Sequence, residues 1–317
     1  MKILVSDPIS SSAVTVLKNE FHVVEKHYSP DELLQQIETF EAIIVRSATQ
    51  VSREVVERGI KLRVIGRAGV GFDNINVKAA TERQIYVVNS PHASTISVAE
   101  LTMAYLLALS RKLVHATNQT KEGLWPKKQL SGTELHNKIL GFVGCGRIGA
   151  EVVRRAQAFG MRCLVYDPYL PADIFQKIGA EQITELPHLF EVSDFVTVHA
   201  LLTEETRGMI GTREFEKMKT TAFIVNCARG GIIDEEALYI ALTKNQIAGA
   251  ALDVFTVEPA RKSKLFELEN LYASPHIAAS TQEAQDRAGQ VIAEQVRLVL
   301  TGQKPTSCVN ARELGLS

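Results

Sequence analysis

The stretch ILGFVGCGRIG at residues 139–149 decides how this chain folds. Its apolar first half is typical of a buried strand, and it ends in the spacing Gly144-x-Gly146-x-x-Gly149. Glycine is needed where a tight turn, a close approach of backbone to a diphosphate and a helix packed on a strand each exclude a β-carbon. The free N–H groups at the start of the next helix favour phosphate binding. The stretch therefore predicts a dinucleotide-binding turn, although a plain turn has the same glycines.

The next apolar run ends in CLVYDP at residues 163–168. This places Asp167 where a ribose-binding acid is expected, about 20 residues beyond the glycines. Its carboxylate would accept hydrogen bonds from ribose hydroxyls and repel a 2′-phosphate. Pro168 and Tyr169 follow, rather than an arginine or lysine that would bind a phosphate. The sequence thus predicts NAD rather than NADP as the cofactor; the alternative is a solvated aspartate in a turn.

Short β-branched runs recur on both sides of this motif and alternate with amphipathic segments. Before the motif, strands are predicted at 2–6, 42–46, 63–66 and 85–89. From the motif onward, six are predicted, at 139–144, 163–167, 195–199, 222–227, 248–254 and 272–274. Strands that alternate with helices form parallel sheets covered on both faces. The chain is therefore predicted to be an α/β protein with a Rossmann-type, doubly wound sheet in its second part.

Helix signals fill the spaces between these strands. The sequence Ser-Pro-Asp-Glu at 29–32 predicts a capped helix start, and 97–120 predicts one long helix. A last helix at 283–300 either closes the nucleotide domain or crosses back to the first domain. Its stripe of predicted contacts consists of Ala288, Ile292, Gln295 and Val299, with Val291 and Val296 beside it.

Size and charge narrow the class of protein. A chain of 317 residues is long enough for about two domains, each with its own core. With 45% hydrophobic and 22% charged residues, the composition is that of a globular protein. The 35 basic and 36 acidic residues leave a net charge of -1, so no overall field attracts nucleic acid or an anionic membrane. Neither partner is predicted.

The cysteines and the apolar runs bear on location and metal binding. The four cysteines form no C-x-x-C pair and no Cys/His cluster with zinc-ligand spacing, so no metal is predicted. Asp7 interrupts the first apolar run before a secretory signal can form. The other apolar runs fall short of the about 20 residues that a membrane span needs. A cytoplasmic location is therefore expected.

Three chemically distinct side chains follow the last three predicted strands: Arg229 in NCARGG, Glu258 in VFTVEP and His276 in SPHIAAS. A neutral imidazole accepts a hydroxyl proton while a hydride leaves the same carbon, provided that an acceptor holds its other nitrogen. A carboxylate is such an acceptor, and a guanidinium matches a substrate carboxylate. Together the three predict hydride and proton transfer between a 2-hydroxy acid and a nicotinamide. Singly, each has a plain alternative: a loop histidine, a turn glutamate and a helix-start cation.

At this point the chain resembles a known family, the D-isomer-specific 2-hydroxyacid dehydrogenases, and within it the catalytic portion of the phosphoglycerate dehydrogenases. The similarity covers nearly the whole chain. The blocks that carry it are GRAGVGFDNI, NSPHASTISVAELT, GTELHNKILGFVGCGRIG, VNCARGGIIDEEAL, GAALDVFTVEP and SPHIAAST. Together these blocks are specific for the family, but they are less decisive for the substrate.

The resemblance implies roles for single residues. Arg229, Glu258 and His276 match the family's catalytic arginine, glutamate and histidine. Arg147 and Ile148 would lie over the diphosphate. The full set that matches the family's cofactor contacts is Gly144, Gly146, Arg147, Ile148, Gly149, Asp167, His199, Ala200, Cys227, Ala228 and Asp253, with Cys227 and Asp253 near the nicotinamide.

The family architecture implies a Rossmann-type nucleotide domain inserted into a smaller, flavodoxin-like α/β substrate domain. The expected boundaries are 1–96 and 283–317 for the substrate domain and 97–282 for the NAD-binding domain. Catalysis is expected in the cleft between them. Members of the family are typically dimers joined through the nucleotide domain and the helix that matches 97–120, so a homodimer or higher homo-oligomer is expected.

Some features depart from the family pattern. Leu201 replaces a usual proline, Ala278 a usual glycine, and Val70 a threonine found in close relatives. These changes lie next to the cofactor and bear on affinity more than on chemistry. The chain also stops near Ser317, without the regulatory domain that binds serine in longer phosphoglycerate dehydrogenases, so feedback inhibition through that domain is not expected.

The substrate is expected to be a 2-hydroxy acid that carries a phosphate. The resemblance implies that the loop Arg67-Ala68-Gly69-Val70-Gly71 offers backbone N–H groups to its carboxylate, although a plain strand-to-helix turn has the same residues. A phosphate needs a second anion site, for which the candidates are Arg46, Arg67 and the pair Lys127-Lys128, although exposed lysines are usually only solvated.

The leading hypothesis is the NAD-dependent oxidation of 3-phosphoglycerate to 3-phosphohydroxypyruvate. One alternative is a glyoxylate or hydroxypyruvate reductase that acts on an unphosphorylated acid. Another, from a different class, is an NAD(H)-sensing binding protein that resembles transcriptional corepressors.

Overall fold

The computed structural model describes residues 1–316 and divides the chain into two compact units. One unit is discontinuous and combines Met1–Ser94 with the segment from Ala279 onward. The other is the continuous segment Thr95–Ala278. We call them the outer unit and the inserted unit, and each is described by itself.

The outer unit contains one parallel sheet of five strands in the order β2-β1-β3-β4-β5. The strands are β1 (Lys2–Val5), β2 (His22–Glu25), β3 (Ala42–Val45), β4 (Val64–Arg67) and β5 (Tyr86–Asn89). This order is that of flavodoxin-like sheets. The four predicted strands are confirmed, but β2 was not predicted. It is an edge strand with no fully buried residue, so its sequence lacks the apolar pattern of its neighbours.

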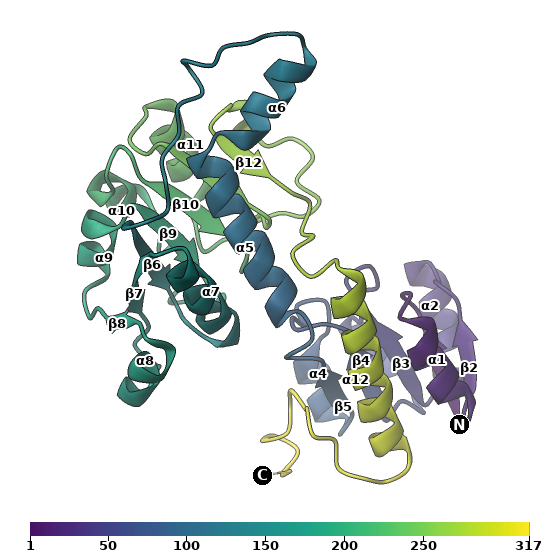
Figure 1. The fold of residues 1–317 in the computed structure, drawn as a ribbon. Helices are drawn as coiled ribbons and strands as arrows, with labels where there is room; N and C mark the ends of the chain where they lie inside the picture. The colour runs from purple at the N-terminus through teal and green to yellow at the C-terminus, as the bar shows by residue number, and fades with distance from the viewer. Residues whose placement is uncertain (317) are drawn as a thin grey trace. The chain divides into compact units, whose positions relative to one another are not determined.

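Helices cover both faces of this sheet (Figure 1). They are α1 (Ser11–Lys18), α2 (Pro30–Gln36), η1 (Ile37–Thr39), α3 (Arg53–Arg58), α4 (Val77–Glu82) and α12 (Gln282–Leu300). One apolar cluster contains the buried residues of α1 and α12, and another contains those of α2, α3 and α4. The predicted helix start is confirmed: the Glu32 N–H donates to Ser29 Oγ at 3.4 Å, and the Ser29 N–H donates to the Glu32 carboxylate at 2.9 Å.

The last helix, α12, returns to the outer unit, which decides between the two alternatives left open by its sequence. Ile292 and Val296 are fully buried against β4, where a β-carbon on Gly66 would lie 3.0 Å from each of them. Gln295 interrupts the apolar stripe because its Oε1 accepts hydrogen bonds from the N–H groups of the following loop, at Thr306 and Ser307. Val291, by contrast, is exposed.

The inserted unit contains a parallel sheet of seven strands in the order β12-β11-β10-β9-β6-β7-β8. The strands are β6 (Ile139–Val143), β7 (Arg162–Tyr166), β8 (Glu181–Gln182), β9 (Phe195–Val198), β10 (Phe223–Asn226), β11 (Gly249–Leu252) and β12 (Leu271–Ala273). Counted from β6, this is the order 3-2-1-4-5-6 of dinucleotide-binding sheets, with one more strand beyond the sixth. The six predicted strands are confirmed. The seventh, β8, has two exposed residues and no apolar signal.

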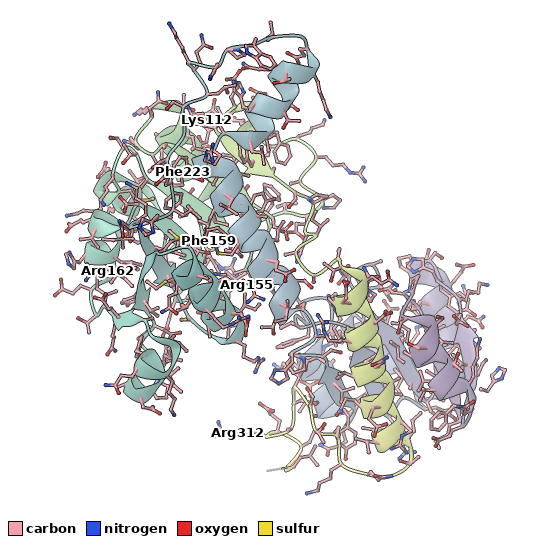
Figure 2. All side chains as sticks on the ribbon, viewed as in Figure 1. Lys112, Arg155, Phe159, Arg162, Phe223 and Arg312 are labelled. Atoms are coloured by element: carbon pink, nitrogen blue, oxygen red, sulfur yellow. The ribbon has the colours of Figure 1, made fainter. Side chains whose placement is uncertain are left out.

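Its helices are α5 (Thr95–Ser110), α6 (Leu113–Lys121), α7 (Arg147–Ala158), α8 (Ala172–Ile178), α9 (Leu186–Val192), α10 (Thr212–Lys217), α11 (Glu235–Thr243) and η2 (Lys264–Glu267). The prediction of one helix over 97–120 is wrong, because Lys112 adopts a φ of 50° and separates α5 from α6 (Figure 2). Buried residues line α5, whereas α6 has none. The sequence of α6 continues the helical pattern of α5, but its residues are not buried against the rest of the unit.

All four cysteines are free, and Cys145, Cys163 and Cys227 are buried. Within residues 1–316, no helix combines the length and the apolar character that crossing a bilayer requires.

Candidate active site

Three adjacent strands of the inserted unit deliver the three proposed catalytic side chains. Arg229 follows β10, Glu258 follows β11 and His276 follows β12, and these strands are neighbours in the sheet. All three strands are parallel, so their carboxyl ends lie at one edge. Ligands of open α/β sheets bind outside this edge.

The structure brings Glu258 and His276 into direct contact. His276 Nδ1 lies 2.7 Å from Glu258 Oε2, and the Phe255 N–H donates to Glu258 Oε1 at 3.0 Å. Both carboxylate oxygens are therefore held. An ionised glutamate requires the proton on Nδ1, which leaves Nε2 of a neutral imidazole as a hydrogen-bond acceptor. The side chain of His276 is 48% exposed and that of Glu258 is 36% exposed, so a substrate can reach this pair.

The electrostatics stabilise the protonated form of the imidazole and the ionised form of the carboxylate. The hydrogen bond to Glu258 raises the pKa of His276; partial burial and the charge of Arg229 oppose this effect, while the charges of Glu258 and Asp253 add to it. Partial burial raises the pKa of Glu258, but the bonds from His276 and from the Phe255 N–H outweigh burial, so its pKa is lowered overall. Glu258 therefore stays ionised at neutral pH and stabilises the imidazolium.

Arg229 belongs to the same cluster, because its positive charge lowers the pKa of both Glu258 and His276. Buried Asn226 shapes its loop: the side-chain amide donates to Arg229 O at 2.9 Å and accepts from the Ala228 N–H at 2.9 Å. A β-carbon on Gly230 would lie only 1.9 Å from Phe255 O. Glycine there lets the loop after β10 lie directly against the loop that carries Glu258.

The buried environment of Asp253 was not predicted from the sequence. It is 0% exposed, and its carboxylate accepts the N–H groups of Ile277 and Ala278, each at 2.8 Å. The hydroxyl of Ser274 also donates to this carboxylate. Asp253 thus holds the side chain of Ser274 before His276 and the backbone after it. The φ of 55° at His276 is unusual for a residue other than glycine.

The glycine-rich turn has the shape that dinucleotide binding needs. Gly144 has a φ of 80°, and a β-carbon on it would lie 2.8 Å from the Ala200 N atom. A β-carbon on Gly149 would meet Cys145 Sγ at 3.1 Å. Gly146 differs, since it begins the twelve-residue helix α7 without a side-chain cap and has no atom within 4 Å of its β-carbon position. The turn is therefore closely packed at Gly144 and Gly149 and open at Gly146.

Asp167 lies beside this turn. Its carboxylate accepts the Cys145 N–H at 2.9 Å and the Tyr169 N–H at 3.0 Å, and the residue is partly exposed. Two N–H donors on one carboxylate leave further lone pairs for ribose hydroxyls. The open, uncapped helix start and the adjacent acid therefore fit the diphosphate and the ribose of NAD.

The remaining cofactor candidates of the inserted unit lie at the same edge of the sheet. Arg147 and Ile148 open α7; His199 and Ala200 follow β9; Cys227 and Ala228 follow β10. Burial lowers the pKa of His199 to about 4, so its ring is neutral, and its Nε2 lies 3.0 Å from Thr197 Oγ1. Burial raises the pKa of Cys227 to about 12, so it carries a thiol and not a thiolate.

The outer unit brings the two arginine candidates together on neighbouring strands. Arg67 ends β4 and pairs in register with Val45, which directly precedes Arg46. Buried Asp7 fixes the Arg46 loop by accepting the Arg46 N–H at 2.6 Å. The guanidinium of Arg67 lies over Gly69, since a β-carbon there would be 2.1 Å from its Nη1. Both cations therefore lie at the carboxyl edge of this sheet.

The other substrate candidates are less closely grouped. Ala68 is buried and donates its N–H to Val45 O at 2.9 Å, whereas Val70 is partly exposed. Lys127 is exposed in the loop after α6, in the inserted unit.

A known family matches most of the inserted unit. Residues 103–278 match the model of the D-isomer specific 2-hydroxyacid dehydrogenase, NAD binding domain. This match covers more than half of the chain. The chain belongs to the D-isomer-specific 2-hydroxyacid dehydrogenase family. Its inserted unit contains the NAD-binding domain of that family.

Individual relatives are similar over almost the whole chain. The D-3-phosphoglycerate dehydrogenase of Methanocaldococcus jannaschii is 48% identical over 98% of this chain, and that of Rattus norvegicus is 44% identical over 99%. The chain spans 59% of the length of each of these two proteins.

Solved structures show the same two-unit fold. A protein of Thermus thermophilus is 33% identical, with a TM-score of 0.88 over 98% of this chain and 100% of that one. A glyoxylate reductase of Paecilomyes thermophila is 27% identical, with a TM-score of 0.89 over 98% of both chains.

Two residues that shape these loops were not predicted from the sequence. Asn226 ends β10, Asp7 lies two residues after β1, and both are buried, yet a polar residue after an apolar run has no distinctive spacing. The available signal was their position: a small polar side chain at the carboxyl end of a buried parallel strand faces the loops of its neighbours.

The contact between His276 and Glu258 predicts a titration shift. In Glu258→Gln, the pKa of His276 should fall, because the charged hydrogen-bond partner that raises it is lost. The pKa is measured by NMR of protein labelled with ¹³C at the histidine Cε1, with His276→Gln used to assign the signal. Glu236→Gln, at an exposed carboxylate of α11, serves as the control and should leave the titration unchanged. An unchanged His276 titration in Glu258→Gln contradicts the pairing.

Proposed function

We propose that this protein is an NAD-dependent oxidoreductase that interconverts a D-2-hydroxy acid and its 2-oxo acid, with 3-phosphoglycerate as the substrate. The observation that carries the proposal is the 2.7 Å contact between His276 Nδ1 and Glu258 Oε2, at the sheet edge that also bears Arg229 and the glycine-rich turn. This arrangement combines a proton acceptor, an anion-binding cation and a dinucleotide site.

In the oxidation direction, the neutral imidazole of His276 accepts the hydroxyl proton of the substrate at Nε2. Glu258 stabilises the imidazolium that forms, since its carboxylate accepts the Nδ1 proton throughout. NAD⁺, when bound, supplies the acceptor for the hydride that leaves C2. The C2–H and O–H bonds break, and a C=O bond forms. In the opposite direction, the imidazolium returns the proton.

Arg229 has the role of binding and orienting the substrate. Its guanidinium presents paired donors, which suit the carboxylate and the C2 oxygen of a 2-hydroxy acid. For the cofactor, the proposed contacts are the N–H groups at Gly146 and Arg147 for the diphosphate and Asp167 for the ribose. Asp167 disfavours a 2′-phosphate by charge repulsion, which supports NAD over NADP.

The phosphate of the substrate is assigned to the cations of the outer unit. Arg46 and Arg67 lie on neighbouring strand ends and supply two guanidinium groups, while Lys127 is a further candidate. Of the backbone donors that the resemblance implied for the carboxylate, the Val70 N–H is the one assigned here, because the Ala68 N–H already donates to Val45 O and the Gly69 N–H to Arg67 O. The similarity to D-3-phosphoglycerate dehydrogenases over 98% of the chain or more supports a phosphorylated acid.

A second candidate is the reduction of glyoxylate or another unphosphorylated 2-oxo acid. The fold of a glyoxylate reductase matches this chain with a TM-score of 0.89, so the fold does not separate the two activities. The chemistry at His276 is the same in both. The difference rests on whether a second anion site recognises a phosphate.

We also propose that the protein is a homodimer joined through α6 and the loop after it. Leu113, Val114 and Leu124 are exposed there, and Trp125 is 82% exposed. The structure describes all of α6, and none of its residues is buried. Large apolar side chains left exposed on this helix and on the loop after it favour association with a second copy.

The state of the cysteines supports a cytoplasmic location. All four are free thiols, and Cys308 is not fully buried. Reducing compartments maintain thiols in this form.

The first prediction concerns the proton acceptor. His276→Gln should lower kcat about 100- to 10,000-fold, as expected for the loss of a general base. The dissociation constant of NADH, measured by fluorescence titration, should stay within about 2-fold, because the side chain moves a proton and does not hold the nucleotide. His188→Gln, at an exposed histidine of α9, is the control. Normal turnover in His276→Gln removes the histidine from the mechanism.

The second prediction concerns the phosphate. Arg46→Ala and Arg67→Ala should each lower kcat/KM for 3-phosphoglycerate about 10- to 100-fold more than kcat/KM for glycerate, because each removes charged hydrogen bonds to the phosphate. Initial rates of NADH formation give both constants. Arg58→Ala, on the exposed side of α3, should affect neither. Equal losses for both substrates would favour the unphosphorylated acid.

The third prediction concerns association. Trp125→Asp should convert a dimer into a monomer, because a charge would replace the most exposed apolar side chain of the proposed interface. Sedimentation equilibrium measures the mass in solution. Val16→Asp, at an exposed position of α1 in the outer unit, should leave the mass unchanged. A wild-type monomer, or a dimer that survives Trp125→Asp, rejects this interface.

A further inference from the structure

A chain of hydrogen bonds connects the interior of helix α5 to the loop that carries His276. Tyr105 is 8% exposed on α5, and its hydroxyl donates to Ser274 Oγ. Ser274 directly follows β12, and its own hydroxyl donates to Asp253 Oδ1. All of these residues belong to the inserted unit.

The direction of this chain is fixed by chemistry. Burial raises the pKa of Tyr105 to about 12, so its hydroxyl keeps the proton that it donates. Ser274 has a single hydroxyl hydrogen, and the carboxylate of Asp253 can only accept. Because Tyr105 occupies a lone pair of Ser274 Oγ, the serine hydrogen is left to point at Asp253. Each group therefore orients the next.

Asp253 in turn fixes the backbone of the loop that carries His276. Its carboxylate accepts the Ile277 and Ala278 N–H groups, just after His276, while the His276 N–H donates to Ser274 O at 3.0 Å. His276 is thus held between two attachment points, one at Ser274 and one at Asp253. Its φ of 55° lies in a region that costs energy and persists only where the surroundings enforce it.

We propose that Tyr105 and Ser274 are positioning residues that set the orientation of His276 toward Glu258 by fixing the Asp253 carboxylate. Neither residue touches the imidazole. They act through the backbone of the turn, so removing their hydroxyls changes where Nδ1 lies relative to Glu258. The inference deepens the proposed function, and rests on it for the role of His276 in proton transfer.

The experiment compares Tyr105→Phe and Ser274→Ala with wild type, and uses Ser274→Thr as the conservative variant. Tyr272→Phe is the matched control: it removes a phenolic hydroxyl from a tyrosine of β12 that hydrogen-bonds the backbone of His115, outside the chain to Asp253. Two quantities are measured. One is the pKa of His276 from the NMR signal of its ¹³C-labelled Cε1, and the other is kcat, with its pH profile, for the oxidation of 3-phosphoglycerate.

We expect the pKa of His276 to fall in Tyr105→Phe and further in Ser274→Ala, because a less ordered turn weakens the bond to Glu258 that raises it. The acid limb of the kcat profile should also move to lower pH, because it reports the same imidazole in the enzyme–substrate complex. At its plateau, kcat should fall about 3- to 10-fold, with KM and NADH affinity unchanged, as expected for one lost hydrogen bond. Ser274→Thr should restore wild-type values, and Tyr272→Phe should retain them.

The proposal is overturned if the His276 titration in Tyr105→Phe and in Ser274→Ala matches that of Tyr272→Phe. It is also overturned if thermal unfolding shows that the two variants lose stability while their folded fraction keeps the wild-type titration, since the hydroxyls are then only structural. The NMR measurement does not depend on turnover. A wild-type protein that is inactive on every 2-hydroxy acid would therefore reject the proposed function and leave the positioning of His276 to be judged by the titration alone.

Discussion

The site depends on one constraint: parallel strands that are neighbours in a sheet direct their carboxyl ends to the same edge. Because β10, β11 and β12 lie side by side, Arg229, Glu258 and His276 meet although they are far apart in the sequence. The 2.7 Å contact between His276 and Glu258 follows from this register. The same edge carries the glycine-rich turn after β6, so sheet order alone places His276 and the dinucleotide motif on one side of the inserted unit.

The buried carboxylate of Asp253 further constrains the loop that carries His276. Asp253 is fully buried, and burying a carboxylate is costly unless hydrogen bonds compensate for the lost water. Here the donors are two N–H groups and a hydroxyl from the segment that contains His276. The requirement to satisfy this carboxylate is therefore also what holds the turn that carries His276 in its strained conformation. Glu258 has the complementary environment, since it stays partly exposed and ionised beside the imidazole.

Much of this could be read from the sequence because it depends on local signals. The glycine spacing at 144–149, the acid at 167, and Arg229, Glu258 and His276 in the loops after strands are each visible within a short window. Packing decides the rest. Strands β2 and β8 lie at sheet edges with little buried surface, and the break at Lys112 depends on the left-handed backbone there. The partners of Asp253 come from residues more than 20 positions away, which no spacing rule reveals.

The return of α12 to the outer unit has a consequence for biosynthesis. Arg63 donates to Leu300 O across 237 positions, and Ile292 and Val296 cover the face of β4. Until α12 has been synthesised, this face of the five-stranded sheet lacks the cover of Ile292 and Val296, although α1 packs there, whereas the whole inserted unit precedes α12 in the chain. Contacts so distant in sequence form slowly. During much of its synthesis, the nascent chain therefore exposes an incompletely covered apolar face of the sheet. Chaperones shield surfaces of this kind.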